Sequence, residues 1–483
     1  MLHNSSKPAR YAAFLGLIIT LLLLSSLLVA CGEDATPTQT LPGPTSTSAP
    51  VTVTSEPPTA APVATNTPTA RPEGSLAPIN TLPNITPAVS PSPSTGGFYG
   101  QLPTPPRTLN PQAEALPTAT PPHPLTKGGF VVASSAGLFT LDAQGSGEKL
   151  LAGNAGFTEP QVSPDGLLVA VFRVDRISKQ SQLALVNTAG AIKIVQPDNG
   201  GVFLSATWSP DSKKLALTRA TDTNGDGVAD TFDATSLVLY DVASGKQQTV
   251  GDGGYPAWSP DGTRLAYLIS PQAADDIDPA TRELRHNPNA LAVYNLPGNS
   301  KRTLTESKGL QVKLGAAAFQ PIQPDQALDV RYFKAVTWHP DGKHITASAD
   351  LSGPNGLRAG VVLSVTLDDP VPKVVTAAGD AAGRLSWSAD GKRLAFETLP
   401  QYPVGPNSAS QIALLPDASP ETAAPLKTLL GNPATRSEGH NPRWLPDGNL
   451  AYLEGDRFVL VIVDSTGQHP TQLISDCSGF DWY

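Results

Sequence analysis

The sequence predicts an all-β protein, a β-propeller of seven (alternatively six) four-stranded antiparallel blades that follows a disordered Pro/Thr/Ser-rich stalk. Two observations predict the propeller. A turn signature returns about every 50 residues, and apolar and polar residues alternate on both sides of it. A third observation, a sharp change of composition near residue 128, separates the propeller from the stalk.

The signature is Ser-Pro-Asp-Gly or a close variant of it. A side chain at the first position can bond back to the backbone, Pro sets φ near −65°, and Gly accepts the conformation that reverses the chain. The copies begin at Ser163, Ser209, Ser259, His339, Ser388 and Leu445. Tryptophan directly precedes the last five copies, at Trp208, Trp258, Trp338, Trp387 and Trp444, and Val162 precedes the first.

Each copy therefore predicts a hairpin between two strands. Tyr255–Trp258 enters one turn and Arg264–Leu268 leaves it, with the period of two that is typical of half-buried strands. Two more short strands usually follow, such as Ser236–Asp241 and Gln247–Val250. Four antiparallel strands per repeat, repeated radially, make a propeller.

With these motifs, residues 128–483 resemble the TolB-like propellers built from WD40-like repeats, whose hallmark is a tryptophan, a Ser-Pro-Asp-Gly turn and an apolar strand. The resemblance implies the fold. It leaves function open, because such propellers include periplasmic binding proteins, accessory domains of peptidases and surface proteins.

The two ends of the propeller complement each other. Residues 129–153 carry three apparent strands, Phe130–Ala133, Leu138–Leu141 and Lys149–Ala152, but no preceding tryptophan strand. The segment Cys477–Tyr483 stops where a turn would come. Pairing the ends would close the ring with a composite seventh blade and remove unpaired edges. The alternative is an open ring of six blades in which Trp482 only fills a terminal core position.

Residues 1–30 resemble a lipoprotein signal peptide. Lys7 and Arg10 precede an apolar stretch, and Leu28–Cys31 has the form of a lipobox, so Cys31 is the expected lipidation site. An uncleaved membrane anchor is the alternative, since the apolar run is long enough to span a bilayer. Either reading places the rest of the chain outside the cytoplasm, attached to a bacterial cell membrane.

Residues 31–127 form the predicted stalk. Its Pro, Thr, Ser and Ala content provides too little apolar surface to offset chain entropy, so we expect disorder with polyproline character. The leader holds two basic residues and residues 32–127 hold five acids and three bases, which leaves a charge of about −9 on the propeller. An acidic domain without basic clusters argues against nucleic acid as a partner. With Cys31 lipidated, Cys477 has no partner and should be buried as a small hydrophobe.

One loop resembles the calcium loops of EF-hands and dockerins. Oxygen-bearing groups occupy its ligand positions, and Gly227 occupies the sharp-turn position. The expected ligands of a structural Ca²⁺ are Asp222, Asn224, Asp226, the Val228 carbonyl, Asp230 and Asp233. Asp233 replaces the usual bidentate Glu, which weakens the match. An ion-free turn cluster of Asp, Asn and Gly is the alternative.

The long segments all fall at one end of the predicted ring, between second and third strands or between blades. They are residues 271–290, 306–332, 351–358, 399–410 and 431–441. Short turns on one face and long loops on the other are typical of a binding surface on a rigid scaffold. The candidate ligand-face residues are Asp275, Asp276, Arg282, Arg285, Tyr402, Arg436 and His440. For the charged segment around Asp275 a merely solvated loop is the alternative.

Compact signatures of hydrolases, phosphate loops and Cys/His metal sites are absent from the sequence. The favoured function is therefore a lipid-anchored binding or scaffold module for a protein, peptide or glycan. The alternative is an extracytoplasmic hydrolase with its catalytic residues scattered over the same face. His339 stands where Ser usually stands in the turn, and the sequence gives it no further role.

Overall fold

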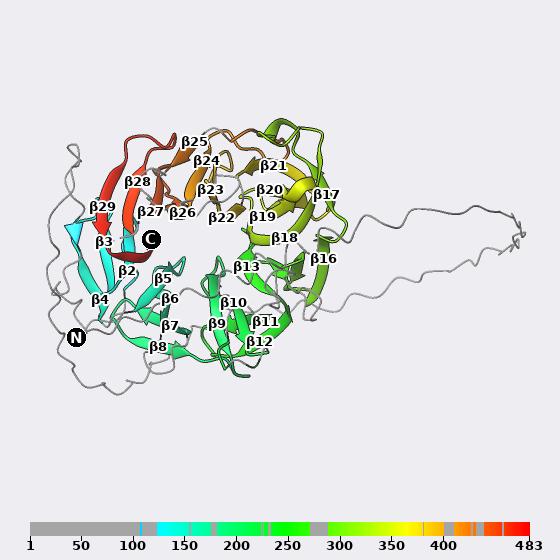
Figure 1. Cartoon of the computed structure of the whole chain (residues 1–483). Coiled ribbons are helices and arrows are strands. Elements are labelled where there is room, and N and C mark those ends of the chain that lie inside the picture. Colours follow the sequence, from blue (N-terminus) through cyan, green and yellow to red (C-terminus); the bar gives the residue numbers. More distant parts are fainter. Residues whose placement is uncertain are drawn as a thin grey trace, which may run out of the picture. The chain divides into compact units, whose positions relative to one another are not determined.

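Seven β-sheets follow one another around a ring in the computed structural model (Figure 1). The structure describes residues 107–108, 123–153, 156–174, 181–223, 225, 227–229, 233–270, 288–379, 381–399, 410–426, 428–430, 439–455 and 458–483. All of them belong to one compact unit of the chain, Pro78–Tyr483. Cys31 and most of the predicted stalk lie outside the described residues.

The blades are numbered here in chain order, with the innermost strand of each given first. Blade 1 consists of β5 (Phe157–Val162), β6 (Leu168–Val174), β7 (Ser181–Asn187) and β8 (Ile192–Val195). Blade 2 consists of β9 (Val202–Trp208), β10 (Lys214–Thr221), β11 (Ala234–Asp241) and β12 (Gln247–Asp252). Blade 3 consists of β13 (Gly254–Trp258), β14 (Arg264–Ile269), β15 (Ala290–Asn295) and β16 (Ser300–Glu306).

The next three blades repeat this order. Blade 4 consists of β18 (Ala327–Trp338), β19 (His344–Ser352), β20 (Arg358–Thr366) and β21 (Lys373–Ala378). Blade 5 consists of β22 (Ala381–Trp387), β23 (Leu394–Leu399), β24 (Gln411–Leu415) and β25 (Thr428–Leu430). Blade 6 consists of β26 (Gly439–Trp444), β27 (Leu450–Glu454), β28 (Val459–Val463) and β29 (Thr471–Ser475).

Blade 7 combines both ends of the propeller. Its innermost strand is β30 (Cys477–Trp482), followed by β2 (Gly129–Ser134), β3 (Gly137–Asp142) and β4 (Lys149–Gly153). Phe130 is paired with Trp482 and Val132 with Phe480. The composite seventh blade is thus confirmed, and the open six-bladed alternative is wrong.

Two segments extend blades beyond four strands. β17 (Gln311–Lys313) pairs with the start of β18, and the short 3-10 helix η1 (Gly315–Ala317) follows it. The predicted loop 306–332 is therefore largely ordered, because this segment has a sheet edge to pair with. A second 3-10 helix, η2 (Pro354–Gly356), joins β19 to β20. β1 (Arg107–Thr108) runs parallel to β29, so the chain contacts blade 6 before residue 128.

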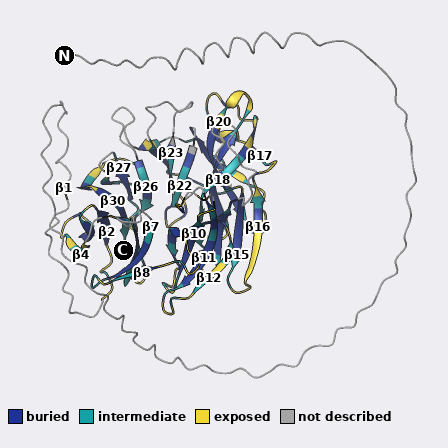
Figure 2. Ribbon diagram, turned by 60° about the horizontal axis from the view of Figure 1, so that its bottom comes forward, coloured by how far each residue is buried: buried dark blue, intermediate teal, exposed yellow. Residues whose placement is uncertain are grey.

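The core lies between blades rather than within them. In the described residues, a hydrophobic cluster straddles each of the seven blade interfaces. Along β14, Leu265 and Tyr267 pack toward blade 2, whereas Ala266 and Leu268 pack toward blade 4, and all four are fully buried. The prediction of half-buried strands is wrong here, because every sheet is covered on both faces by its neighbours. Only outer strands such as β16 are mostly exposed (Figure 2).

The motif tryptophans connect neighbouring blades. The Nε1–H group of Trp208 donates to the Gln161 carbonyl of blade 1 at 2.9 Å, and that of Trp258 donates to the Thr207 carbonyl of blade 2 at 3.1 Å. Trp338 and Trp444 make the same contact with the blades before them. These tryptophan side chains therefore lie between neighbouring blades.

The signature turns have the predicted hydrogen bonds. In blade 1, Gly166 N–H donates to the Ser163 carbonyl at 2.7 Å, and the Ser163 hydroxyl donates to Asp165 at 2.6 Å and accepts Leu168 N–H at 2.9 Å. The glycine φ of +71° explains why this residue type recurs. Cys477 is buried as expected, and burial raises the pKa of its thiol to about 12.

None of the described residues forms a helix with the length and apolar character that a bilayer crossing requires.

Ring closure should carry much of the stability. Phe480 is fully buried against Phe130, with ring centroids 6.2 Å apart. Phe480→Ala should lower the free energy of unfolding by roughly 3 to 5 kcal/mol, and deletion of residues 479–483 should abolish cooperative unfolding. Denaturant titration measures both effects. Val371→Ala, at a side chain that is 66% exposed, is the control. A truncated protein with the stability of the full chain would contradict closure by the termini.

Candidate functional site

The inner strands of blades 1 and 6 carry bulges at polar residues. The pairing of β5 with β6 shifts between Thr158 and Gln161, and β26 shifts against β27 between His440 and Arg443. At these bulges Glu159 and Asn441 have φ of +49° and +52°. A β-bulge re-aims side chains, and such strained backbone in a non-glycine residue is typical of functional sites. The bulges therefore mark the region around the axis as a candidate site.

Arg384 of β22 connects three blades there. Its guanidinium bonds the Glu159 carboxylate of blade 1 at 2.5 Å and the Asn441 side-chain oxygen of blade 6 at 3.4 Å. Glu397 of β23 accepts Asn441 N–H at 2.7 Å. Blades 6 and 7 lie between blades 5 and 1 in the ring, so the ion pair reaches across it. We call Glu159, Arg384, Glu397 and Asn441 the axial cluster.

Arg384 of the axial cluster stays charged and is accessible to solvent. Desolvation lowers the pKa of Arg384, but the carboxylates of Glu159 and Glu397 outweigh this effect and raise it. The side chains of Arg384 and Glu159 are 50% and 40% exposed. An ion pair exposed to this degree contributes little to stability, at most about 1 kcal/mol. Its charges remain available to a ligand.

Two aromatic rings adjoin this cluster on blade 6. His440, next to Asn441, lies 5.9 Å from the Phe458 ring, which belongs to the connection between β27 and β28. Phe458 is 41% exposed, which is unusual for a large apolar side chain in this propeller. His440 is thus the one candidate ligand-face residue that the described part of the chain includes, and it lies beside the axial cluster.

Blade 4 adds a second charged group from its inner strand. Lys334 of β18 pairs with Asp350 of β19 at 3.2 Å. Burial, together with the Asp350 charge, raises the pKa of the neighbouring Tyr332 to about 12. Like blade 5, blade 4 therefore presents a cation and a carboxylate on its two inner strands, and it adds the Tyr332 ring.

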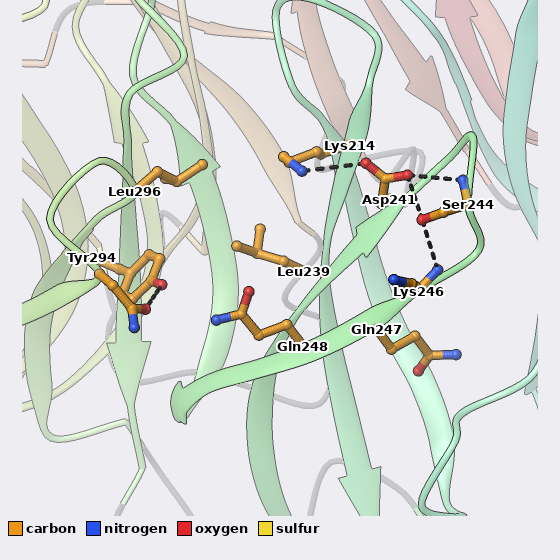
Figure 3. Close-up of a pocket in the computed structure, with 10 residues that line it drawn as sticks. Lys214, Leu239, Asp241, Ser244, Lys246, Gln247, Gln248, Tyr294 and Leu296 are labelled. Atoms are coloured by element: carbon orange, nitrogen blue, oxygen red, sulfur yellow. Dashed lines mark hydrogen bonds and ion pairs between the residues drawn. The ribbon is translucent and has the colours of Figure 1, made fainter.

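A pocket of about 560 Å³ lies elsewhere, between blades 2 and 3 at the end that carries the signature turns (Figure 3). Its Lys214 and Asp241 pair with each other at 3.4 Å, and Asp241 also accepts the Ser244 hydroxyl at 2.7 Å. Hydrogen bonds from Ser244 hold the pKa of Asp241 below its usual value. Two of the charged groups of this pocket, Lys214 and Asp241, are therefore already paired with each other.

The turn of blade 4 gathers three possible metal ligands. His339, Asp341 and His344 each place one donor atom within 4.8 Å of the others. Desolvation raises the pKa of Asp341, but hydrogen bonds from Lys343 N–H, His344 and His339 outweigh it and hold the pKa well below its usual range. Desolvation likewise lowers the pKa of His344, yet Asp341 and Glu421 raise it overall.

The calcium-like loop is described only in part. The Asp222 carboxylate accepts Gly225 N–H at 2.7 Å and Gly227 N–H at 3.0 Å. Asp233 is buried and accepts Thr223 N–H at 2.8 Å, which fastens the two ends of the loop together. Val228 is 49% exposed. Asn224, Asp226 and Asp230 lie outside the described residues.

The remaining predicted positions also lie outside the described residues: Cys31, Asp275, Asp276, Arg282, Arg285, Tyr402 and Arg436. Sequence reasoning missed the axial cluster, because its partners are 225 residues apart and meet only in the closed ring. It also missed the pairing of His339 with His344. The available signal was the loss of Ser at the first turn position together with a second His five residues later.

No family model matches the chain, and no curated protein does. Among solved structures, the propeller is similar to TolB from Acinetobacter baumannii, at 16% identity and a TM-score of 0.40 over 74% of this chain and 79% of that one. It is also similar to a TolB from Agrobacterium tumefaciens described as putative, at 12% identity and 0.37 over 72% and 89%. Kuenenia stuttgartiensis hydrazine synthase gives 13% identity and 0.46 over 69% and 90%. The chain is thus structurally similar to TolB-like propellers at low identity, and its fold rests on its own sheet topology.

Proposed function

We propose that this protein is a lipid-anchored extracytoplasmic binding or scaffold module. Its propeller holds a protein, peptide or glycan against the end that carries the long loops, here called the loop face. The opposite end, with the signature turns, is the turn face. The observation that carries the proposal is the axial cluster, in which the half-exposed Arg384 and Glu159 meet from blades that are not neighbours.

The closed ring fixes these groups before a ligand arrives. Each blade is hydrogen-bonded internally and packed on both sides, so the inner strands have little freedom to rearrange. A preorganised site loses less entropy on binding. Arginine and aromatic side chains dominate the energy of most binding surfaces. The axial cluster supplies Arg384, which bonds Asn441 of β26, and Phe458 contacts His440 of that same strand.

The anchor in this proposal is Cys31, with residues 32–127 as the tether. A tether of this composition would hold the propeller away from the lipid headgroups, with a reach of about 50 Å if it behaves as a flexible coil. The acidic propeller would be repelled by an anionic lipid surface, which favours a ligand other than the membrane itself.

Photo-cross-linking in cells tests which face binds. A cross-linking amino acid at Asn355 or Phe458 probes exposed positions of the loop face, and one at Lys213 or Lys392 probes the turn face. We expect cross-linked species from the first pair only. Cross-links confined to Lys213 and Lys392 would refute binding through the loop face.

The axial cluster should serve binding more than stability. Arg384→Met should change the free energy of unfolding by less than about 1 kcal/mol, yet lower the cross-linking yield from Phe458 roughly tenfold, as for a typical hot-spot arginine. Arg393→Met is the matched control in the same blade. Arg393 donates to the Gly448 carbonyl at 3.1 Å and covers the Trp444 ring, so its loss should mainly destabilise the fold. Unchanged cross-linking in the Arg384 variant would contradict a binding role.

We further propose that the loop from Asp222 to Asp233 binds a structural Ca²⁺. Hydrogen bonds to Asp222 and Asp233 already curl the loop and tie its ends together. Oxygen ligands at this spacing suit Ca²⁺, with the weak affinity typical of extracellular modules.

Calcium should therefore stabilise the folded protein by mass action. At a free concentration of 100 times Kd, the gain would be about 2.7 kcal/mol. Thermal melts with EDTA and then with millimolar Ca²⁺ measure the shift, and Asp226→Ala should remove it. Asp165→Ala, in a turn outside the loop, should leave the calcium-dependent shift in place. If wild type shows no shift and no heat of binding, the loop is an ion-free turn cluster.

A further inference from the structure

The turn of blade 4 departs from its counterparts at two positions at once. Its first residue is His339, whereas four of the other turns have Ser and blade 6 has Leu445. The residue five positions later is His344. The other blades have Leu168, Lys214, Arg264, Arg393 and Leu450 at that position. Two imidazoles therefore flank the one signature aspartate, Asp341.

Both imidazoles turn the same nitrogen toward one carboxylate oxygen. Asp341 Oδ2 lies 3.1 Å from His339 Nδ1 and 2.6 Å from His344 Nδ1. The two rings stand edge to face, with centroids 5.9 Å apart. Three potential ligand atoms from a six-residue segment thus lie within 4.8 Å of one another.

The other ring nitrogen of each histidine, Nε2, donates to a hydrogen-bond acceptor. His339 Nε2 donates to the Gly391 carbonyl of blade 5 at 2.9 Å, and His344 Nε2 donates to the Glu421 carboxylate. His339 Nδ1 also accepts Asp341 N–H at 3.2 Å. In this tautomer of His339, Nδ1 has one lone pair, which the Asp341 N–H occupies, so a cation held between Nδ1 and the Asp341 carboxylate would replace that N–H as the partner of Nδ1.

Metal-binding histidines have such acceptors on the ring nitrogen that does not bind the metal. A ligating imidazole almost always donates its other N–H to a carboxylate or a backbone carbonyl, which fixes its tautomer and orientation. His339 is only 8% exposed, and a Cβ atom on Gly391 would lie 2.6 Å from its Cε1 atom. The ring is therefore tightly enclosed, with its Nδ1 directed at Asp341.

We propose that His339, Asp341 and His344 bind one divalent transition-metal ion of the Zn²⁺ class. Imidazole and carboxylate ligands suit Zn²⁺ and its neighbours rather than Ca²⁺ or Mg²⁺. Ligands of a tetrahedral Zn²⁺ lie about 3.3 Å apart. The contact of Asp341 with His339, at 3.1 Å, is close to that separation. Its contact with His344, at 2.6 Å, lengthens on binding, because the ion displaces the Nδ1 proton of His344 to solvent. Water completes the coordination.

The ion would brace the turn face between blades 4 and 5. Gly391 belongs to the signature turn of blade 5, and Glu421 to its connection between β24 and β25. Glu421 also pairs with Lys373 of β21 at 2.7 Å. Fixing the two imidazoles fixes both of their partners in blade 5. This site uses described residues that are separate from the axial cluster and the calcium-like loop.

Calorimetric titration of ZnCl₂ into the full, untagged chain tests the proposal. The protein is first treated with a chelator and then titrated in the presence of Ca²⁺, so that Zn²⁺ binding to the calcium-like loop is not measured. We expect one Zn²⁺ per chain, a raised melting temperature, and a Co²⁺ absorption spectrum typical of nitrogen and oxygen ligands. His339→Ser with His344→Arg should weaken Zn²⁺ binding at least tenfold and remove the Co²⁺ spectrum. These replacements recreate the turn of Ser259 and Arg264 in blade 3, so the fold should persist.

His469→Gln is the matched control. His469 pairs with Asp464 at 2.8 Å but is 88% exposed and has no third ligand in the described residues, so its loss should leave Zn²⁺ binding unchanged. The proposal would be overturned if the wild-type protein does not bind Zn²⁺ or binds it with a Kd above about 10 μM. Equal binding by wild type and the His339/His344 double variant would overturn it as well.

Discussion

The contact between a motif tryptophan and the blade before it is the interaction on which the ring depends. A single blade cannot cover its own apolar faces, so each must be held against two neighbours. The tryptophan does this with a large buried surface and one directed hydrogen bond to a backbone carbonyl. Blade 5 differs, since Trp387 donates to the Thr346 hydroxyl, which in turn donates to the Thr337 carbonyl. The Thr346 hydroxyl thus links Trp387 to the backbone of blade 4 in place of a direct hydrogen bond.

The junction of blades 7 and 1 lacks this tryptophan and uses a different device. Val162 stands in its place, and Val162 N–H donates at 2.8 Å to the side chain of Asp481. Burial raises the pKa of Asp481, while Arg443 and the hydrogen bond from Val162 oppose that shift. The junction that both termini must form is thus held by a polar group from the last strand. The signature turns add contacts of their own, since Asp165 N–H donates to the Ser212 hydroxyl of the next turn.

Local patterns predicted the repeating parts of the molecule. Ser163-Pro-Asp-Gly specifies its turn through bonds within six residues, and the incomplete ends at Phe130 and Trp482 predicted the composite blade. Contacts that form only in the closed ring have no signature in the local sequence. Glu159 and Arg384 meet because the ring brings blades 1 and 5 within reach of each other, and a bulge sets the direction of Glu159. The pairing of β17 with β18 also depends on an available sheet edge rather than on a motif.

The composite blade also sets the order in which the protein can be completed. The innermost strand of blade 7 consists of the last residues of the chain, and Tyr483 bonds Leu141 from 342 positions away. Blades 2 to 5 have both of their neighbours without β30, but blades 1 and 6 lack their complete shared neighbour, blade 7, until β30 has paired with β2. Until then, Val131 and Phe130 remain uncovered on their strand edge. A chain that lacks β30 therefore exposes the edge of β2, and an unpaired strand edge of this kind promotes aggregation.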